Sequence, residues 1–294
     1  MNLRGTPALQ VIRRFRVDVA AILLLAAAMT VAVDHAGLQS VSAIVPMMGI
    51  VVAIFVGFQN RNAYARWWEA RTLWGGVVSN GRSLHYALLA YEDGTPEMAA
   101  ITDRIRRREV RHAWTLAAEL HRTPTSPQLG DLTPTDPADC TATELLRRQA
   151  VDIGELSHAK MIDRQARRVL VTINSAQVGA AVGLERINSQ PVPRFYALFT
   201  RTLAWSFAVV VCTMLGAGEH DSAAGIALSI LVMTLIVIAE RLGALLEDPM
   251  SDDDFGLPLE RFCAILTGDL LGPSHTLARI ETESHTAAGT VCHR

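Results

Sequence analysis

Cysteine and histidine are the side chains of this chain that could hold a metal ion or attack a substrate. The four cysteines are scattered without a CxxC pair, and the nine histidines form no HExxH or other ligand spacing. Such spacings are typical of zinc sites and metalloenzymes. The sequence also offers no paired acid and base and no nucleophile beside a base. We therefore predict a protein that is not an enzyme, with no zinc site and no disulfide framework.

Three consecutive aspartates, Asp252, Asp253 and Asp254, carry oxygen ligands of the kind that Ca²⁺ prefers. The alternative is a helix N-cap or a solvated acidic turn, which needs no metal. We expect no cofactor and keep calcium at these three residues as the alternative.

The basic residues are almost all arginine, with Lys160 as the single lysine among 27. One helical face carries four of them at i, i+3, i+4 and i+7 spacing, namely Arg104, Arg107, Arg108 and Arg111. A second group follows at Lys160, Arg164, Arg167 and Arg168. Three interpretations stay open: a solvated surface, contacts between subunits, or a vestibule that attracts anions. Nucleic-acid binding is not expected, because no aromatic residues interleave with the basic runs.

Ile50, Ile54 and Phe58 lie at i, i+4 and i+8 in a segment without charges. This spacing places three bulky apolar side chains along one helix face. Several copies around an axis would form stacked apolar rings, which can gate a pore by dewetting. The alternative is that the three residues face lipid or neighbouring helices, and spacing alone favours that alternative.

The elements that would position these residues are four apolar blocks of about 17 or 18 residues, separated by charged segments. Half of the residues are hydrophobic and the mean hydropathy is +0.24, which is more apolar than most soluble proteins. The blocks are at the lower end of the length that a membrane-spanning helix needs. We predict a membrane protein, with the first block retained as a helix rather than cleaved as a signal peptide.

The orientation follows from the basic residues, which gather on the cytoplasmic side of membrane proteins. The two short links between paired blocks carry no basic residue, whereas the segment 61–201 carries 19. Both termini are therefore expected in the cytoplasm, with the two short links on the other side of the membrane. The predicted layout is a cytoplasmic segment at 1–16, spans at 17–33, 41–60, 195–218 and 222–246, a cytoplasmic helical domain at 61–194, and a cytoplasmic tail at 247–294.

The middle segment is too long for a loop and is predicted to be helical. Its Pro- and Thr-rich stretch at 121–140 predicts an exposed loop. Thr141 stands three residues before Glu144, a capping-box pattern that predicts the start of the next helix.

The stretch 55–82, FVGFQNRNAYARWWEARTLWGGVVSNGR, resembles the bestrophin family, particularly its bacterial members. Its apolar span ends in Gly-Phe and is followed by an Asn- and Arg-rich turn and a paired tryptophan in a charged frame. The stretches at 185–205 and 245–263 resemble the family as well. The motif residues are Arg66, Trp67, Trp68, Glu69, Arg71 and Trp74.

The resemblance implies an all-α homopentamer with four transmembrane helices per chain and one central pore for small inorganic ions. Carried onto this chain, the family's neck residues are Ile50, Ile54 and Phe58, so the resemblance favours the pore-facing interpretation. It also places an apolar cytoplasmic constriction near Ile162. Animal members hold calcium at an acidic cluster that corresponds to 252–254. Val51 stands where those members have a proline, which puts an anion site at that position in doubt.

Two other function classes remain as alternatives, a secondary transporter and a membrane-embedded enzyme. A transporter predicts interrupted helices in two similar halves, and the halves of this chain do not match. The expected function is therefore a chloride channel or a channel for other monovalent ions, with anion or cation selectivity left open. We interpret the paired-tryptophan motif as a packed junction that holds the neck helix in register through Arg–carboxylate pairs and buried indoles.

Overall fold

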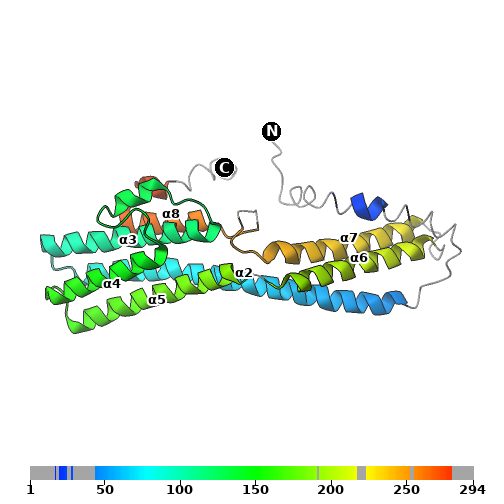
Figure 1. The fold of residues 1–294 in the computed structure, drawn as a ribbon, viewed down its shortest axis with the longest axis horizontal. Coiled ribbons are helices and arrows are strands. Elements are labelled where there is room, and N and C mark those ends of the chain that lie inside the picture. Colours follow the sequence, from blue (N-terminus) through cyan, green and yellow to red (C-terminus); the bar gives the residue numbers. More distant parts are fainter. Residues whose placement is uncertain are drawn as a thin grey trace, which may run out of the picture. The chain divides into compact units, whose positions relative to one another are not determined.

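The computed structural model describes residues 17, 20–24, 28, 44–190, 192–216, 223–251 and 255–279. These residues form helices and turns without any strand, which confirms the predicted all-α class (Figure 1). They divide into a first unit, Met1–Trp67 with Pro191–Asp248, and a second unit, Trp68–Gln190 with Pro249–Arg294. The long helix α2 (Ile44–Tyr91) contributes its beginning to the first unit and its remainder to the second.

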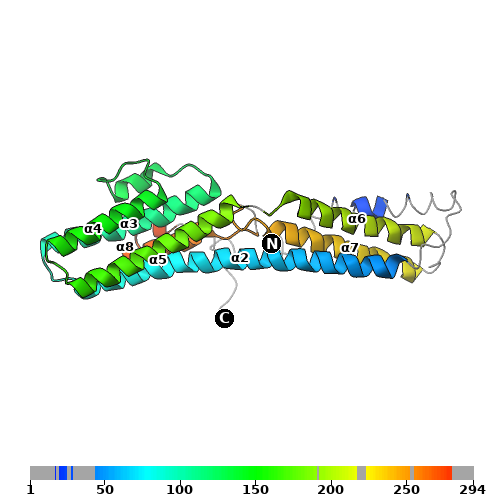
Figure 2. The ribbon, with the colours of Figure 1, turned by 60° about the horizontal axis from the view of Figure 1, so that its bottom comes forward.

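The first unit is built from the beginning of α2 together with α6 (Arg194–Gly216) and α7 (Ala223–Leu246). In both views α6 and α7 run side by side (Figures 1 and 2). Apolar side chains of the three helices form one core together with Ile22, and its other buried residues are Val52, Val56, Phe207, Ala208, Val211, Met233 and Val237.

Among the described residues, no helix is both long enough and apolar enough to cross a membrane. The four predicted spans are therefore not confirmed, and most of the first one, 17–33, lies outside the described residues.

The second unit is a bundle of the remainder of α2 with α3 (Pro96–His121), α4 (Ala142–His158), α5 (Arg164–Ser189) and α8 (Leu259–Leu271) (Figure 2). Two short 3₁₀ turns, η1 (Pro127–Leu132) and η2 (Thr276–Ala278), complete it. One core cluster joins four of the helices, and its buried residues are Leu84, Leu88, Met98, Ile101, Ile105, Ile153, Leu156, Ile162, Ala166 and Leu170.

Side chains at the helix starts fix where these helices begin. The Thr141 hydroxyl accepts a hydrogen bond from the Glu144 amide at 3.2 Å, which confirms the predicted cap of α4. Thr95 caps α3 in the same way, and the Asp163 carboxylate accepts from the Ala166 amide at 2.7 Å to begin α5. Each cap satisfies a backbone donor that the first helical turn leaves unpaired.

Two of the four arginines on the α3 face are internal, so none of the three interpretations offered for the face fits these two, whereas Arg104 and Arg107 stay partly exposed. Arg108 and Arg111 are buried. The Arg108 guanidinium donates to Asp136 at 2.7 Å and also to Asp152, while Arg111 donates to the Thr133 hydroxyl at 2.8 Å. Helical spacing predicted that the arginines share one face. It could not predict that Asp136 from the following loop and Asp152 from α4 would cover part of that face.

The composition of the segment after α3 predicts an exposed loop, but part of this segment is buried. Leu129 and Leu132 in η1 are buried, as are Thr133 and Asp136 beyond it. The loop therefore closes the bundle over α3, because its polar side chains satisfy the buried arginines.

A second buried polar cluster lies around Glu109 on α3, whose side chain is fully buried. Gln149 on α4 donates to one carboxylate oxygen at 2.9 Å, and Gln177 on α5 donates to the other. Burial raises the pKa of Glu109 to about 7, against the lowering effect of the Gln149 hydrogen bond. One helical turn further on, burial lowers the pKa of His112 to about 4.

Candidate functional site

The predicted neck residues lie on one uncovered face of α2. Ile50, Ile54 and Phe58 are 63%, 50% and 52% exposed, so large parts of these apolar side chains are uncovered. On the opposite face, Val52 and Val56 are buried in the core with α6 and α7. The first unit therefore fixes which way α2 faces and leaves this apolar stripe without cover in a single chain.

Polar contacts lock α2 against α7 directly after the stripe ends. The Gln59 amide donates to the Glu247 carboxylate at 3.3 Å, and the Asn60 amide donates to the Ala239 carbonyl oxygen at 3.0 Å. The helices approach so closely at Gly243 that a Cβ atom there would lie 2.7 Å from Asn60 Oδ1.

This lock was not predicted from the sequence. The available signal was a polar Gln-Asn pair at the end of one apolar segment and a glycine, Gly243, near the end of another. The Glu247 carboxyl that receives Gln59 is half-buried, and burial raises its pKa, while the Gln59 hydrogen bond and the Arg66 charge act in the opposite sense.

The second half of the paired-tryptophan motif packs within the second unit. Trp74 is completely buried, and the Arg71 guanidinium lies 4.5 Å from the centre of the Phe262 ring on α8, a cation–π contact. Glu69 pairs with Arg186 on α5. These contacts join α2 to α5 and α8, and the role of the motif as a junction stays a prediction.

The first half of the motif differs from that expectation. Trp67 stacks on Tyr64 with ring centres 6.3 Å apart, but Trp68 is 56% exposed, so the interpretation that the indoles are buried is wrong for Trp68. The boundary between the two units falls between these two tryptophans. The motif therefore marks the place where α2 passes from one unit to the other.

Ile162 lies in the turn between α4 and α5 and is 7% exposed. It belongs to the core cluster of the second unit, beside half-buried Met161. This burial speaks against a pore-lining Ile162, because a constriction requires side chains that the rest of the chain leaves uncovered. The constriction stays a prediction that none of these contacts supports.

The calcium candidates Asp252, Asp253 and Asp254 lie outside the described residues. Within the described part of the chain, no three His, Cys, Asp or Glu side chains gather as metal ligands would.

The second basic group keeps its charges exposed, unlike the arginine face of α3. Lys160, Arg164 and Arg167 line an open cavity of about 510 Å³ at the start of α5. In the part of the chain that the structure describes, none of the three forms an ion pair with a carboxylate. Unpaired cations of this kind attract small anions from solution.

A family model and several individual known proteins match this chain over most of its length. The family model described as "Bacterial/Fungal Bestrophin protein" matches residues 3–271. The "voltage-dependent anion channel-forming protein YneE" of Escherichia coli K12 is 27% identical over 243 residues, which cover 81% of this chain and 78% of that protein. A protein of Ralstonia nicotianae with the same description is 25% identical over 238 residues, covering 77% and 76%.

The fold has relatives among solved structures. A bacterial bestrophin homologue from Klebsiella pneumoniae superposes with a TM-score of 0.79 at 23% identity, covering 86% of this chain and 96% of that one. The similar curated proteins are described as channel-forming proteins and not as enzymes. Because the family model spans nearly the whole chain, the protein belongs to the bacterial and fungal bestrophin family.

Proposed function

We propose that this protein is an ion channel of the inner bacterial membrane that passes small inorganic anions. Two kinds of observation support the proposal. The similar curated proteins carry the description of anion channels, and the chain leaves an apolar stripe uncovered on α2. The four apolar blocks would cross the bilayer, with both termini and the second unit on the arginine-rich cytoplasmic side.

The neck is formed by Ile50, Ile54 and Phe58 from several copies of the chain around one axis. A single chain buries the opposite face of α2 and cannot enclose a pore with one stripe. Five copies, as in the family, would stack three apolar rings that exclude water when narrow and conduct when widened. The exposed stripe on α2 is the observation that carries this proposal.

The exposed cations beside α5 supply a preference for anions that an apolar neck lacks. Lys160, Arg164 and Arg167 have no carboxylate partners among the described residues, so their charge acts on ions in solution. A basic surface near the cytoplasmic mouth would raise the local concentration of anions. The lock of Gln59 and Asn60 on α7 would hold the neck helix in its orientation.

The experiment is current recording from the purified protein in planar lipid bilayers. Replacing Ile50, Ile54 and Phe58 together by alanine widens the proposed rings, so single-channel conductance should rise at least roughly twofold because the dewetting barrier falls. The matched control replaces Leu198, Leu231 and Leu235 by alanine. These side chains are equally large and exposed on α6 and α7.

The control variant should conduct like the wild type. Unchanged conductance in the neck variant, with the oligomer intact on size-exclusion chromatography, would contradict the neck. A flat trace from well-assembled wild-type protein would instead favour the transporter or the membrane-embedded enzyme.

A further inference from the structure

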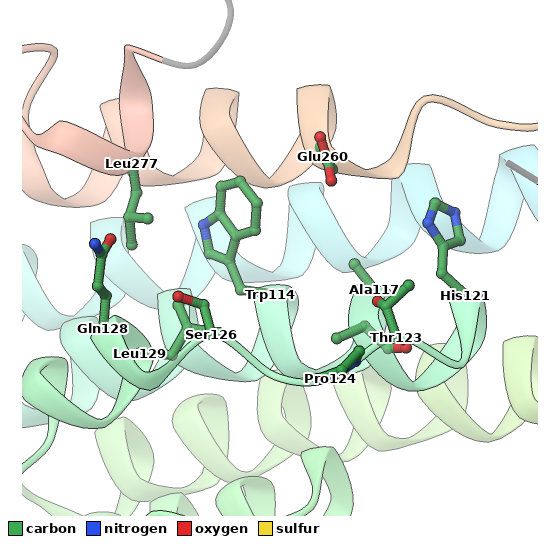
Figure 3. A pocket seen from close by; sticks show the side chains of 11 residues that line it. Trp114, Ala117, His121, Thr123, Pro124, Ser126, Gln128, Leu129, Glu260 and Leu277 are labelled. Atoms are coloured by element: carbon green, nitrogen blue, oxygen red, sulfur yellow. Dashed lines mark hydrogen bonds between the residues drawn. The ribbon is translucent and has the colours of Figure 1, made fainter.

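A small cavity in the second unit lies between the end of α3, the loop that follows it and the start of α8 (Figure 3). Its volume is about 210 Å³, well above the roughly 10–15 Å³ that one water molecule needs on the same measure. We call it the α3–α8 cavity. The proposed neck does not include the α3–α8 cavity, so the side chains of this cavity could serve another function.

Trp114 on α3 provides an aromatic wall of this cavity. Its indole N–H donates to the Thr267 hydroxyl on α8 at 3.0 Å, which fixes the orientation of the ring. With its N–H occupied, the indole can offer a ligand only its ring carbons and its π face. The face of an indole carries negative charge density and attracts cations.

Glu260 supplies a full negative charge at the same cavity. It stands in the first turn of α8, and Figure 3 shows it opposite Trp114 and His121 across the cavity. Among the described residues no arginine, lysine or histidine forms an ion pair with Glu260. An anionic ligand would be repelled here, whereas a cation would gain both the carboxylate and the indole face.

His121 adds a polar atom that the fold leaves unsatisfied. Its Nε2 atom is inaccessible to solvent and has no hydrogen-bond partner within the described residues. A buried polar atom of this kind costs stability unless a ligand or water completes its hydrogen bond. Ser126 and Gln128 extend the polar rim on the loop side, where a hydroxyl or amide of a ligand would be bound.

We propose that the α3–α8 cavity binds a small organic ammonium ion that carries one hydrogen-bonding group. The ammonium group would lie between the Trp114 face and the Glu260 carboxylate, and the second group would reach Ser126 or Gln128 on the loop. The cavity size limits the ligand to a molecule of about the size of choline. Such a site gives this domain a way to sense a metabolite independently of the ion that the neck conducts.

The test is isothermal titration calorimetry on the full-length protein in detergent, with choline, tetramethylammonium and ethanolamine as cationic probes. The neutral isostere of choline, 3,3-dimethylbutan-1-ol, has the same shape without the charge. We expect at least one cationic probe to bind saturably with a dissociation constant below about 10 mM, and the isostere to bind at least roughly tenfold more weakly.

Variants separate this site from unspecific binding. Glu260→Gln and Trp114→Phe should each raise the dissociation constant roughly tenfold or more, because each removes part of the attraction for the cation. Glu97→Gln is the matched control, since Glu97 is also exposed in the first turn of a helix but lies outside the cavity. It should bind like the wild type.

Three results would overturn the proposal. These are the absence of saturable binding for all three cations, equal affinity for the neutral isostere, or an unchanged affinity in Glu260→Gln. Because Glu260 is exposed, Glu260→Gln should fold like the wild type. Size-exclusion chromatography of the variant checks this.

Discussion

Single residues in the core of the second unit tie its stability to pH. Glu109 is fully buried, and its pKa of about 7 lies well above the value near 4.5 of an exposed glutamate. Between these two pH values the folded state holds a proton that the unfolded state releases, so stability falls as pH rises towards 7. The difference corresponds to roughly 3 kcal/mol.

We predict that Glu109→Gln abolishes most of the stability loss that Glu109 causes as the pH rises towards 7. The new amide keeps one oxygen as an acceptor and can donate its N–H to Gln149 or Gln177 once that side-chain amide turns its unpartnered oxygen towards it. The opposite contribution of His112 remains, so chemical unfolding between pH 5 and 8 should show the stability of the variant rising more steeply with pH than that of the wild type. An equal slope in both proteins would contradict the raised pKa of Glu109.

His112 acts in the opposite direction and can be separated from Glu109. Its pKa of about 4 is below the usual 6.5 because burial disfavours the charged ring. Stability that depends on His112 is therefore lost as pH falls from 6.5 towards 4. The same unfolding series should retain this acidic limb in Glu109→Gln.

At the scale of helices, the close approach of α7 to α2 at Gly243 is what holds the neck helix in place. A Cβ atom at Gly243 would displace the Asn60 side chain and break its hydrogen bond to the Ala239 carbonyl. We predict that Gly243→Ala lowers the free energy of unfolding by about 1–2 kcal/mol, although alanine is the better helix former.

Gly154→Ala is the control for Gly243→Ala, because nothing lies within 4 Å of a Cβ atom at Gly154 on α4. It should stabilise the protein by about 0.5–1 kcal/mol. Thermal unfolding in detergent compares the two variants. A stabilised Gly243→Ala protein would show that α2 and α7 do not meet as described.

Sequence patterns predicted the helices better than their partners. Helical spacing, the Thr141 cap and the uncovered stripe at Ile50, Ile54 and Phe58 are local features, so they could be found without a structure. The buried pairing of Arg108 with Asp136 and the Gly243 contact join residues far apart in the chain, and no local pattern encodes them. Ile162 shows the same limit, because an apolar residue at a helix start fits a core and a pore equally well.

For the whole molecule, the central claim is that several copies of this chain enclose one anion-selective pore. Family membership and the helical fold are established, whereas the number of copies and the ion are parts of the proposal. The apolar stripe on α2 and the exposed cations at the start of α5 belong to different units, and in this proposal the stripe supplies the gate and the cations supply the charge preference.

The most direct measurement is the reversal potential of the wild-type protein in a planar bilayer with unequal KCl concentrations on the two sides. K⁺ and Cl⁻ have equilibrium potentials of opposite sign under this gradient, so one number identifies the permeant ion. The account predicts a reversal potential close to the chloride equilibrium potential. A value close to the potassium equilibrium potential would contradict it.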